Sequence, residues 1–378
     1  MGLVVGIDAS RNRSGGAKAH LLGIIKDSNP RAHGIEQVHV WSYPSLLSGL
    51  PDLPWLVKHS PPELQRSLLH QIWWQYRTLP REAKKHGCSV LLNTDAGSVC
   101  RFRPAVTMSR DMLSYEPGEI KRFGLSKARL RLLTLRIVQS QSMRFADGVI
   151  FLTQYAARVI QQTTGGLHRI AVIPHGVGRA FVDRDSRAAW PTDATRSIRC
   201  LYVSNAAMYK HQWEVVRAIS LLRSRGFNLE LVLAGGGRGR AARLLEKEIA
   251  DNDPAGHFVK CLGFVPHDDL PSLLAGADLF VFASSCENMP NTLVEAMAIG
   301  LPIACSNRGP MPEVLCDGGV YFDPENPQSI AAAIETLIRD PELRMSVAKR
   351  AKGLSGQYSW TRCAAETWSF LRAVSESG

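Results

Sequence analysis

Short apolar runs alternate along the whole chain with segments of helical periodicity, and this order limits the fold more strongly than any other feature. Such alternation is typical of parallel sheets whose strands are joined by crossover helices. The runs predicted as strands in the first half are Leu3–Ile7, Val38–Trp41, Val90–Asn93, Ala105–Met108, Gly148–Leu152 and Ile170–Ile173. In the second half they are Arg199–Val203, Leu229–Ala234, Phe258–Leu262, Leu279–Ala283, Pro302–Cys305 and Gly319–Phe322. Each half therefore predicts one doubly wound α/β sheet.

The length of 378 residues favours two domains, since one domain usually takes about 100–200 residues. We expect a first domain over residues 1–180, a charged linker with Pro191 over 181–197, and a second domain over 198–356. The last segment, residues 357–378, predicts a helix with Trp368, Phe370 and Leu371 on its apolar side. That helix must pack against another element.

Charge and cysteine usage narrow the class of partner and the compartment. Lys and Arg number 45 against 34 Asp and Glu, a net charge of +11, so the partner is expected to be anionic. The sequence carries no signature of a nucleic-acid-binding module, which argues against nucleic acid. The eight cysteines form no C-x-x-C pair, so we expect buried free thiols in a reducing cytoplasm and no zinc site. The start, MGLVVGIDAS, predicts a strand rather than a signal peptide, and no apolar run of about 18 residues predicts a membrane span.

Two glutamates follow the strand predicted to end at Ala283. Glu287 lies in a polar loop, and Glu295 lies in a helix expected to open near Pro290 and to end at Gly300. Ligands of open α/β sheets bind at the carboxyl ends of strands, and a helix start suits a diphosphate. A second interpretation stays open, in which Thr292-x-x-Glu295 is a capping box and Glu287 is a solvated loop carboxylate.

The Glu287-x7-Glu295 spacing followed by Ala-Met-Ala-x-Gly-x-Pro resembles the signature of retaining glycosyltransferase family four, whose members have the GT-B fold. Further blocks are similar to that family in the same order: Ser14-Gly-Gly-Ala17, Ala146-Asp-Gly-Val-Ile150, Val172-Ile-Pro-His-Gly-Val177, Leu262-Gly-Phe-Val265 and Tyr358-Ser-Trp360. The resemblance covers nearly the whole chain. It implies two Rossmann-like domains facing across a cleft, with the last helix crossing back to the first domain.

The resemblance also implies roles for individual residues. Glu287 would contact the transferred sugar and Glu295 the ribose, neither acting as a general base. Further donor-binding residues would be the phosphate loop Asn288, Met289, Pro290, Asn291 and Thr292, and the base-binding backbone of Gly263, Phe264 and Val265. Gly15 and Gly16 would bring backbone N–H groups to the diphosphate from the other domain. The alternative for these glycines is a plain strand-to-helix turn.

A cation should stabilise the departing nucleoside diphosphate. In the family a loop after the first strand of the second domain carries an Arg and a Lys for this purpose. Lys210 matches the Lys, whereas the Arg position falls at Ser204 or Asn205. Lys210 alone, Arg238 or Arg308 would then have to supply the charge, or activity is reduced. Gly235–Gly239 has the wrong spacing for a dinucleotide-binding motif.

On the acceptor side, many relatives carry a His-Asp pair where this chain has Arg110 and Asp111. Asp111 is predicted either to act near the acceptor or to cap a turn, and Arg110 to bind an acidic group. The segment Glu119–Val138 interleaves six basic residues with apolar ones. It is predicted to form a basic amphipathic helix, which either lies on an anionic membrane that holds a lipid-linked acceptor or packs on the first domain.

We therefore expect a retaining glycosyltransferase of the hexosyltransferase type that uses a nucleotide diphosphate-sugar and needs no cofactor or metal. The acceptor would be a glycan, a lipid-linked or a small molecule in polysaccharide or glycoconjugate biosynthesis. The enzyme would be cytoplasmic, with a peripheral position on the inner face of the cell membrane. Two rival interpretations are a nucleotide-sugar epimerase of the same fold and a catalytically weak nucleotide-sugar-binding protein.

Overall fold

The computed structural model describes residues 2–13, 15–26, 28–186, 190 and 196–377. The chain divides into two compact units, unit 1 with Met1–Gly176 and Tyr358–Gly378, and unit 2 with Val177–Gln357. Of the predicted linker, residues 187–189 and 191–195 lie outside the described part, as does Ser14 of the first glycine block.

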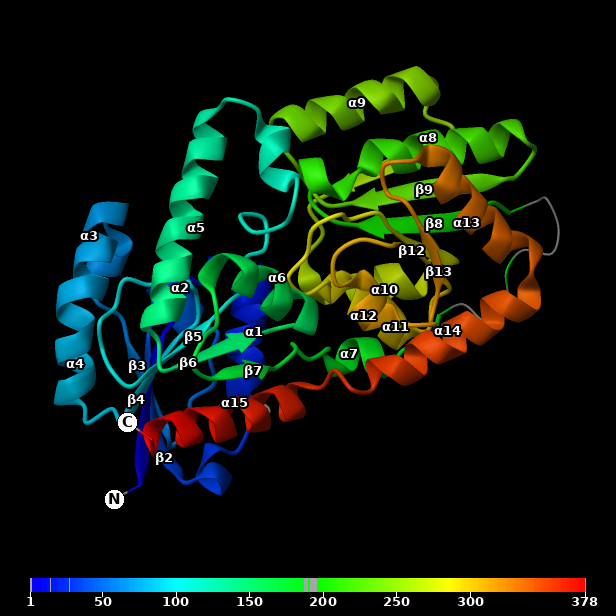
Figure 1. Ribbon diagram of the computed structural model, residues 1–378. Helices are drawn as coiled ribbons and strands as arrows, with labels where there is room; N and C mark the ends of the chain where they lie inside the picture. The colour runs from blue at the N-terminus through cyan, green and yellow to red at the C-terminus, as the bar shows by residue number, and fades with distance from the viewer. Residues whose placement is uncertain (1, 14, 27, 187–189, 191–195, 378) are drawn as a thin grey trace. The chain divides into compact units, whose positions relative to one another are not determined.

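Unit 1 contains a seven-stranded parallel sheet in the order β3-β2-β1-β4-β5-β6-β7 (Figure 1). Its strands are β1 Leu3–Asp8, β2 Ile35–Trp41, β3 Leu56–His59, β4 Val90–Asn93, β5 Ala105–Met108, β6 Gly148–Phe151 and β7 Ile170–Val172. Its α-helices are α1 Gly15–Lys26, α2 Pro44–Leu47, α3 Leu68–Trp73, α4 Leu79–Lys85, α5 Lys127–Phe145, α6 Gln154–Thr164 and α15 Trp360–Ser375. The central strands β4, β5 and β6 are buried along their whole length, as expected where helices cover both faces of a parallel sheet.

Unit 2 contains a six-stranded parallel sheet in the order β10-β9-β8-β11-β12-β13. Its strands are β8 Ile198–Val203, β9 Leu229–Ala234, β10 Val259–Gly263, β11 Leu279–Phe282, β12 Ile303–Ser306 and β13 Val320–Phe322. Its α-helices are α7 Arg179–Val182, α8 Gln212–Ser224, α9 Arg240–Asn252, α10 Leu270–Ala275, α11 Asn291–Ile299, α12 Met311–Leu315, α13 Pro327–Arg339 and α14 Pro341–Ser355.

The predicted fold class is confirmed, because each unit is a Rossmann-like doubly wound sheet. All twelve predicted strands are present, each within a few residues of its expected bounds. The strand that the sequence analysis missed is β3, whose four residues are all half-buried and pair with β2 at the edge of the sheet. A four-residue edge strand buries too little apolar surface to leave a clear pattern in the sequence.

The C-terminal helix α15 belongs to unit 1, where it contacts α1, β4 and β5. Trp368 and Leu371 on its apolar side are completely buried. At its start, a Cβ on Gly176 would come within 2.2 Å of the backbone nitrogen of Trp360, so only glycine permits this close packing. This contact joins the His-Gly block near residue 175 to the closing Ser-Trp block.

Two predicted segments have a different structure from the one expected. Helix α7, Arg179–Val182, crosses the predicted boundary between the first domain and the linker, and Phe181 is buried within unit 2 beside His267. The basic segment Glu119–Val138 is not one helix: a 3-10 helix, η4 Glu119–Phe123, ends at Gly124 with φ +54°. Helix α5 then begins anew because the Ser126 hydroxyl caps it, accepting from the Arg129 N–H at 3.3 Å.

The structure also tests two further expectations, that the thiols are free and buried and that no segment spans a membrane. All eight thiols are free, but Cys261 and Cys316 are exposed rather than buried. Within the described residues, no helix has both the length and the apolar character to cross a bilayer.

Candidate active site

The carboxyl edge of the unit 2 sheet brings Lys210 and Glu287 together. Strand order reverses between β8 and β11, and such a switch point leaves a crevice at the carboxyl ends of the two strands. Lys210 follows β8 and Glu287 follows β11, and their side chains form an ion pair. Only about 15% of each side chain is exposed, so the pair is largely shielded from solvent.

The backbone on both sides of this ion pair is fixed. Lys210 ends a short 3-10 helix, η5 Met208–Lys210, and its carbonyl accepts a hydrogen bond from the buried Tyr202 hydroxyl at 2.6 Å. The neighbouring Tyr209 carbonyl accepts from the Ser285 N–H at 2.8 Å, which ties the loop after β8 to the loop after β11. The ammonium group of Lys210 is thus held at a defined place rather than left on a free loop.

Helix α11 opens beside the Glu287 loop, as the sequence predicted. Its N-cap residue is Pro290, no side chain caps it, and Gly300 ends it in the left-handed conformation with φ +79°. The capping-box interpretation of Thr292 and Glu295 is therefore wrong, because the N-cap lies two residues before Thr292 and Glu295 lies in the second turn of the helix. The preceding residues Asn288 and Met289 are buried, so the loop packs closely under the helix start.

Glu295 lies in α11 with a partner that the sequence analysis did not name. Its Oε1 lies 3.0 Å from His267 Nε2, and this hydrogen bond raises the pKa of His267, while burial opposes the rise. The other oxygen, Oε2, is buried and has no hydrogen-bond partner among the described residues. A buried carboxylate oxygen without a donor is costly, and the hydroxyl of a ligand would relieve that cost.

The loop after β10 provides the surface predicted for the nucleoside base. Gly263 has φ +67°, and its carbonyl accepts from the Gly235 N–H at 2.7 Å. Phe264 follows with 79% of its surface exposed, and Val265 is half-buried. The same loop continues to His267, so the residues predicted for the base and for the ribose are connected through the His267–Glu295 contact.

No cation replaces the missing arginine at its expected position, where Ser204 is half-buried and Asn205 is exposed. Of the two substitutes considered, Arg308 pairs with Asp323 at 3.3 Å. Arg238 is exposed and has no ion pair with any residue that the structure describes. It follows Gly237, which forms a parallel bridge with Ala206, so Arg238 lies next to the loop that carries Lys210.

Three of the predicted site residues, Gly15, Gly16 and Asp111, lie in unit 1, as the sequence predicted. Gly15 and Gly16 begin α1, and an added Cβ on Gly15 would meet no atom within 4 Å. Asp111 accepts hydrogen bonds from the Leu113 N–H at 3.1 Å and the Gln139 amide at 3.3 Å. These bonds show that Asp111 caps a turn, the structural role that the sequence analysis left open, and burial raises the pKa of its carboxyl.

Arg110, next to Asp111, keeps one nitrogen without a hydrogen-bond partner among the described residues. Its Nη2 donates to Asn12 Oδ1 at 2.8 Å and lies 3.9 Å from Asp95, whereas its Nη1 is buried without a partner among the described residues. Burial lowers the pKa of this guanidinium. An unsatisfied donor at the carboxyl edge of the unit 1 sheet is suited to an anionic group.

Comparison with known proteins agrees with this geometry. Residues 186–354 match the family model of the glycosyl transferases group 1. Unit 2 carries a group 1 glycosyl transferase domain. This domain holds Lys210, Glu287 and Glu295, and its match together with the structural neighbours supports a GT-B glycosyltransferase.

Individual relatives are more distant. The O-antigen chain mannosyltransferase B of Escherichia coli is 36% identical over 110 residues, 29% of each chain. Sucrose-phosphate synthase from Thermosynechococcus elongatus has a TM-score of 0.77 at 17% identity, with all of both chains covered. Anabaena Alr3699/HepE, solved in complex with UDP and glucose, has a TM-score of 0.70 at 19% identity over all of both chains. The likeness to these two structures shows that the chain has the GT-B fold.

The chain aligns with less than two thirds of the first three curated relatives, over 29%, 45% and 59% of their lengths.

Proposed function

We propose that the chain is a retaining glycosyltransferase that moves a hexose or a related sugar from a nucleotide diphosphate-sugar to an acceptor. The observation that carries this proposal is the Lys210–Glu287 pair at the switch point of the unit 2 sheet, with the open oxygen of Glu295 in the adjoining helix. The UDP complex of the Anabaena relative supports a nucleotide-sugar donor.

In this proposal the donor separates the ion pair. The diphosphate takes the ammonium of Lys210, and the hydroxyls of the sugar donate to the carboxylate of Glu287. The leaving diphosphate gains negative charge as the glycosidic bond breaks, and a fixed cation that is shielded from water stabilises this charge strongly. The N–H groups at the start of α11 act on the same charge, so the transfer requires no metal or other cofactor.

Calorimetry with a panel of uridine, guanosine and adenosine diphosphate-sugars tests the proposal. We expect one donor to bind in the micromolar range, and nuclear magnetic resonance of the product to show the anomeric configuration of the donor retained. Epimerisation of the donor without an acceptor would favour the epimerase interpretation, and binding without turnover the binding-protein interpretation. If no member of the panel bound, the proposed function would be wrong.

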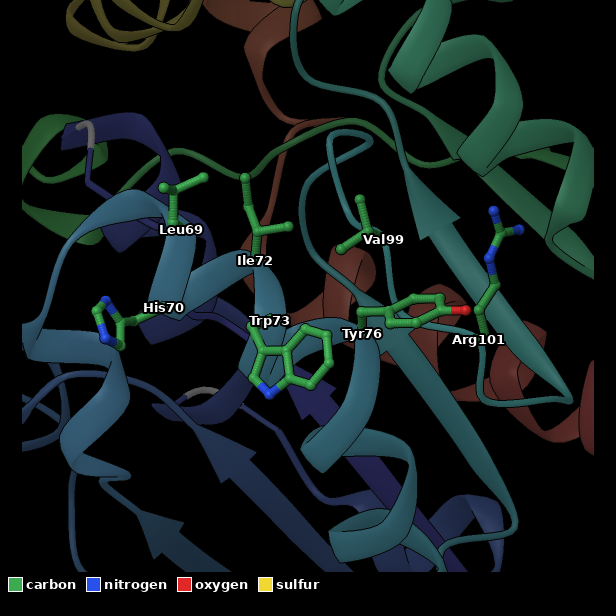
Figure 2. A pocket seen from close by; sticks show the side chains of 7 residues that line it. All are labelled: Leu69, His70, Ile72, Trp73, Tyr76, Val99 and Arg101. Atoms are coloured by element: carbon green, nitrogen blue, oxygen red, sulfur yellow. The ribbon is translucent and has the colours of Figure 1, made fainter.

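The acceptor side of the proposal rests on an apolar groove in unit 1. Two hollows of about 720 Å³ and 450 Å³ share Ile72 and Val99. The larger lies along α3 and the turn that follows it, and the smaller lies between α3 and α5. Figure 2 shows Trp73 and Tyr76 on neighbouring turns of one helical segment, with Val99 and Arg101 on the loop opposite. Leu69, Trp73 and Leu130 each expose more than 60% of their surface, and large apolar side chains gathered in this way mark an interaction surface.

The positive charge around this groove indicates that its ligand is anionic. Residues 64–81 and 120–146, which include α3 and α5, contain no Asp or Glu. Arg11, Arg101, Lys127 and Arg131 line the two hollows among the apolar side chains. Apolar side chains bordered by cations suit an anionic bilayer surface, so we propose that this groove contacts the membrane that holds a lipid-linked acceptor.

Arg110 is connected to this groove through its contacts with residues close in the chain to the groove lining. Arg11 and Gly97 line the groove, and Arg110 contacts their neighbours Asn12 and Asp95. In this proposal a lipid-linked acceptor keeps its chain in the groove, and its negative head group accepts a hydrogen bond from Nη1 of Arg110. In this arrangement Arg110 binds the acidic group of the acceptor, which is the role that the sequence analysis predicted for Arg110.

Replacing Leu69 and Trp73 together by serine is expected to lower partitioning onto anionic vesicles by at least about tenfold, because the variant loses two exposed apolar side chains. Co-sedimentation with phosphatidylglycerol-containing and pure phosphatidylcholine vesicles measures this change. Met345→Ser, which removes an exposed apolar residue of unit 2, is the matched control and should bind as the wild type does. Wild-type protein that bound both kinds of vesicle equally poorly would contradict the membrane assignment.

A further inference from the structure

Three histidines from three separate elements converge in unit 1. His39 lies on β2, His59 ends β3, and His86 follows the end of α4. One nitrogen from each ring lies within 4.8 Å of the other two, and His39 Nδ1 is 2.8 Å from His59 Nε2. The residues are 20 and 27 positions apart, so no local motif in the sequence indicated the cluster.

The structure orients these rings on more than one side. Trp41 lies in register with His59 on the neighbouring strand and stacks on its ring at 4.8 Å between centroids. His39 Nε2 lies 3.1 Å from Gln37 Oε1, which leaves Nδ1 facing His59. Glu82, one turn before His86 on α4, has a carboxylate oxygen 3.7 Å from His86 Nε2. Carboxylates and amides around metal-binding histidines commonly fix the orientation of the rings in this way.

The geometry of the cluster suits a metal cation. His39 is buried, while His59 and His86 are partly exposed and leave an entry path from solvent. In a tetrahedral zinc site with Zn–N bonds of about 2.0–2.1 Å, the nitrogens lie about 3.4 Å apart. The present separations of 2.8 to 4.8 Å bracket that value.

We infer that His39, His59 and His86 bind one Zn²⁺ ion, with Glu82 or water in the fourth position. The ion would join the edge strand β3 and the end of α4 to β2. None of the residues assigned to donor or acceptor belongs to this site, so the ion would stabilise unit 1 and take no part in transfer. This inference is independent of the proposed function, and it differs from the expectation that the chain needs no metal.

The test uses full-length protein that carries no histidine tag and has been treated with a chelator. We expect one equivalent of Zn²⁺ to bind and to raise Tm, and Co²⁺ to give the intense visible absorption of a tetrahedral site. His59→Ala and His86→Ala are each expected to weaken Zn²⁺ binding by at least about tenfold, since each loses a ligand. The control His168→Ala removes an exposed histidine outside the cluster and should leave both readouts unchanged.

Equal Zn²⁺ affinity in the His59→Ala and wild-type proteins would overturn the inference. If the alanine variants do not fold, His59→Gln keeps a polar side chain of similar reach and serves in their place. X-ray absorption of the zinc-loaded wild type gives a second readout that needs no variant. Three imidazole ligands would support the site, and fewer than two would refute it.

Discussion

Replacing Lys210 by methionine is expected to lower kcat for glycosyl transfer by about 10²–10³-fold, the usual cost of losing one fixed group that stabilises charge in a transition state. Methionine keeps most of the length and the apolar stem of lysine but removes the charge that faces Glu287. Because the charge acts mainly on the departing diphosphate, KM for the donor should change much less than kcat. Steady-state kinetics with saturating acceptor measures both values.

Two comparisons separate this catalytic role from a structural one. Lys210→Met leaves the carboxylate of Glu287 without its partner in a shielded place, so some loss of thermal stability is expected. The double variant with Glu287→Gln removes the unpaired charge and should recover Tm without recovering kcat. A Lys210→Met enzyme that kept kcat within about threefold of wild type would remove Lys210 from the mechanism.

Substitutions of Arg238 and Arg308 test which of these two arginines supplies the positive charge that the family's missing arginine would provide. Arg308 is already paired with Asp323, whereas Arg238 is exposed beside the loop that carries Lys210. If Arg238 supplies the second positive charge, Arg238→Met lowers kcat and Arg308→Met does not. The reverse result would assign that charge to Arg308.

The strands and the helix at the donor site could be predicted from the sequence, because each depends on residues that are close together in the chain. The run Leu279–Phe282 is apolar throughout and completely buried, as a central parallel strand must be. Pro290 and Gly300 then set the two ends of α11 through the conformations that these residues favour. The family resemblance added the assignment of the two glutamates, which the local pattern alone left open.

Contacts between distant segments could not be predicted in the same way. The ion pair of Lys210 with Glu287 joins residues 77 positions apart, and the contact of His267 with Glu295 joins residues 28 apart. The three histidines of unit 1 meet only because β3 pairs with β2, and β3 was itself missed. Sequence periodicity reports which face of an element is buried, but it does not report which side chains meet across elements.

Replacing Glu295 by glutamine tests the ribose assignment with the least change in shape. A carboxylate that accepts bonds from two ribose hydroxyls contributes charge-assisted hydrogen bonds, each worth about 1.5–3 kcal/mol. We therefore expect Kd for the donor to rise by about 10–100-fold, because every 1.4 kcal/mol changes affinity tenfold. Calorimetry with the donor identified in the panel measures this change, and Glu246→Gln, at an exposed position on α9, is the matched control.

A donor analogue that lacks the ribose 3′-hydroxyl makes the assignment specific. Wild-type protein should bind this analogue more weakly than the donor, since Glu295 then loses one of its hydroxyl partners. In the Glu295→Gln variant the analogue and the donor should bind almost equally, because two changes that remove the same interaction are not additive. Strictly additive losses would show that Glu295 acts elsewhere, and its open Oε2 would then need another ligand. Non-additive losses would place the ribose at the buried oxygen that no residue of the described chain satisfies.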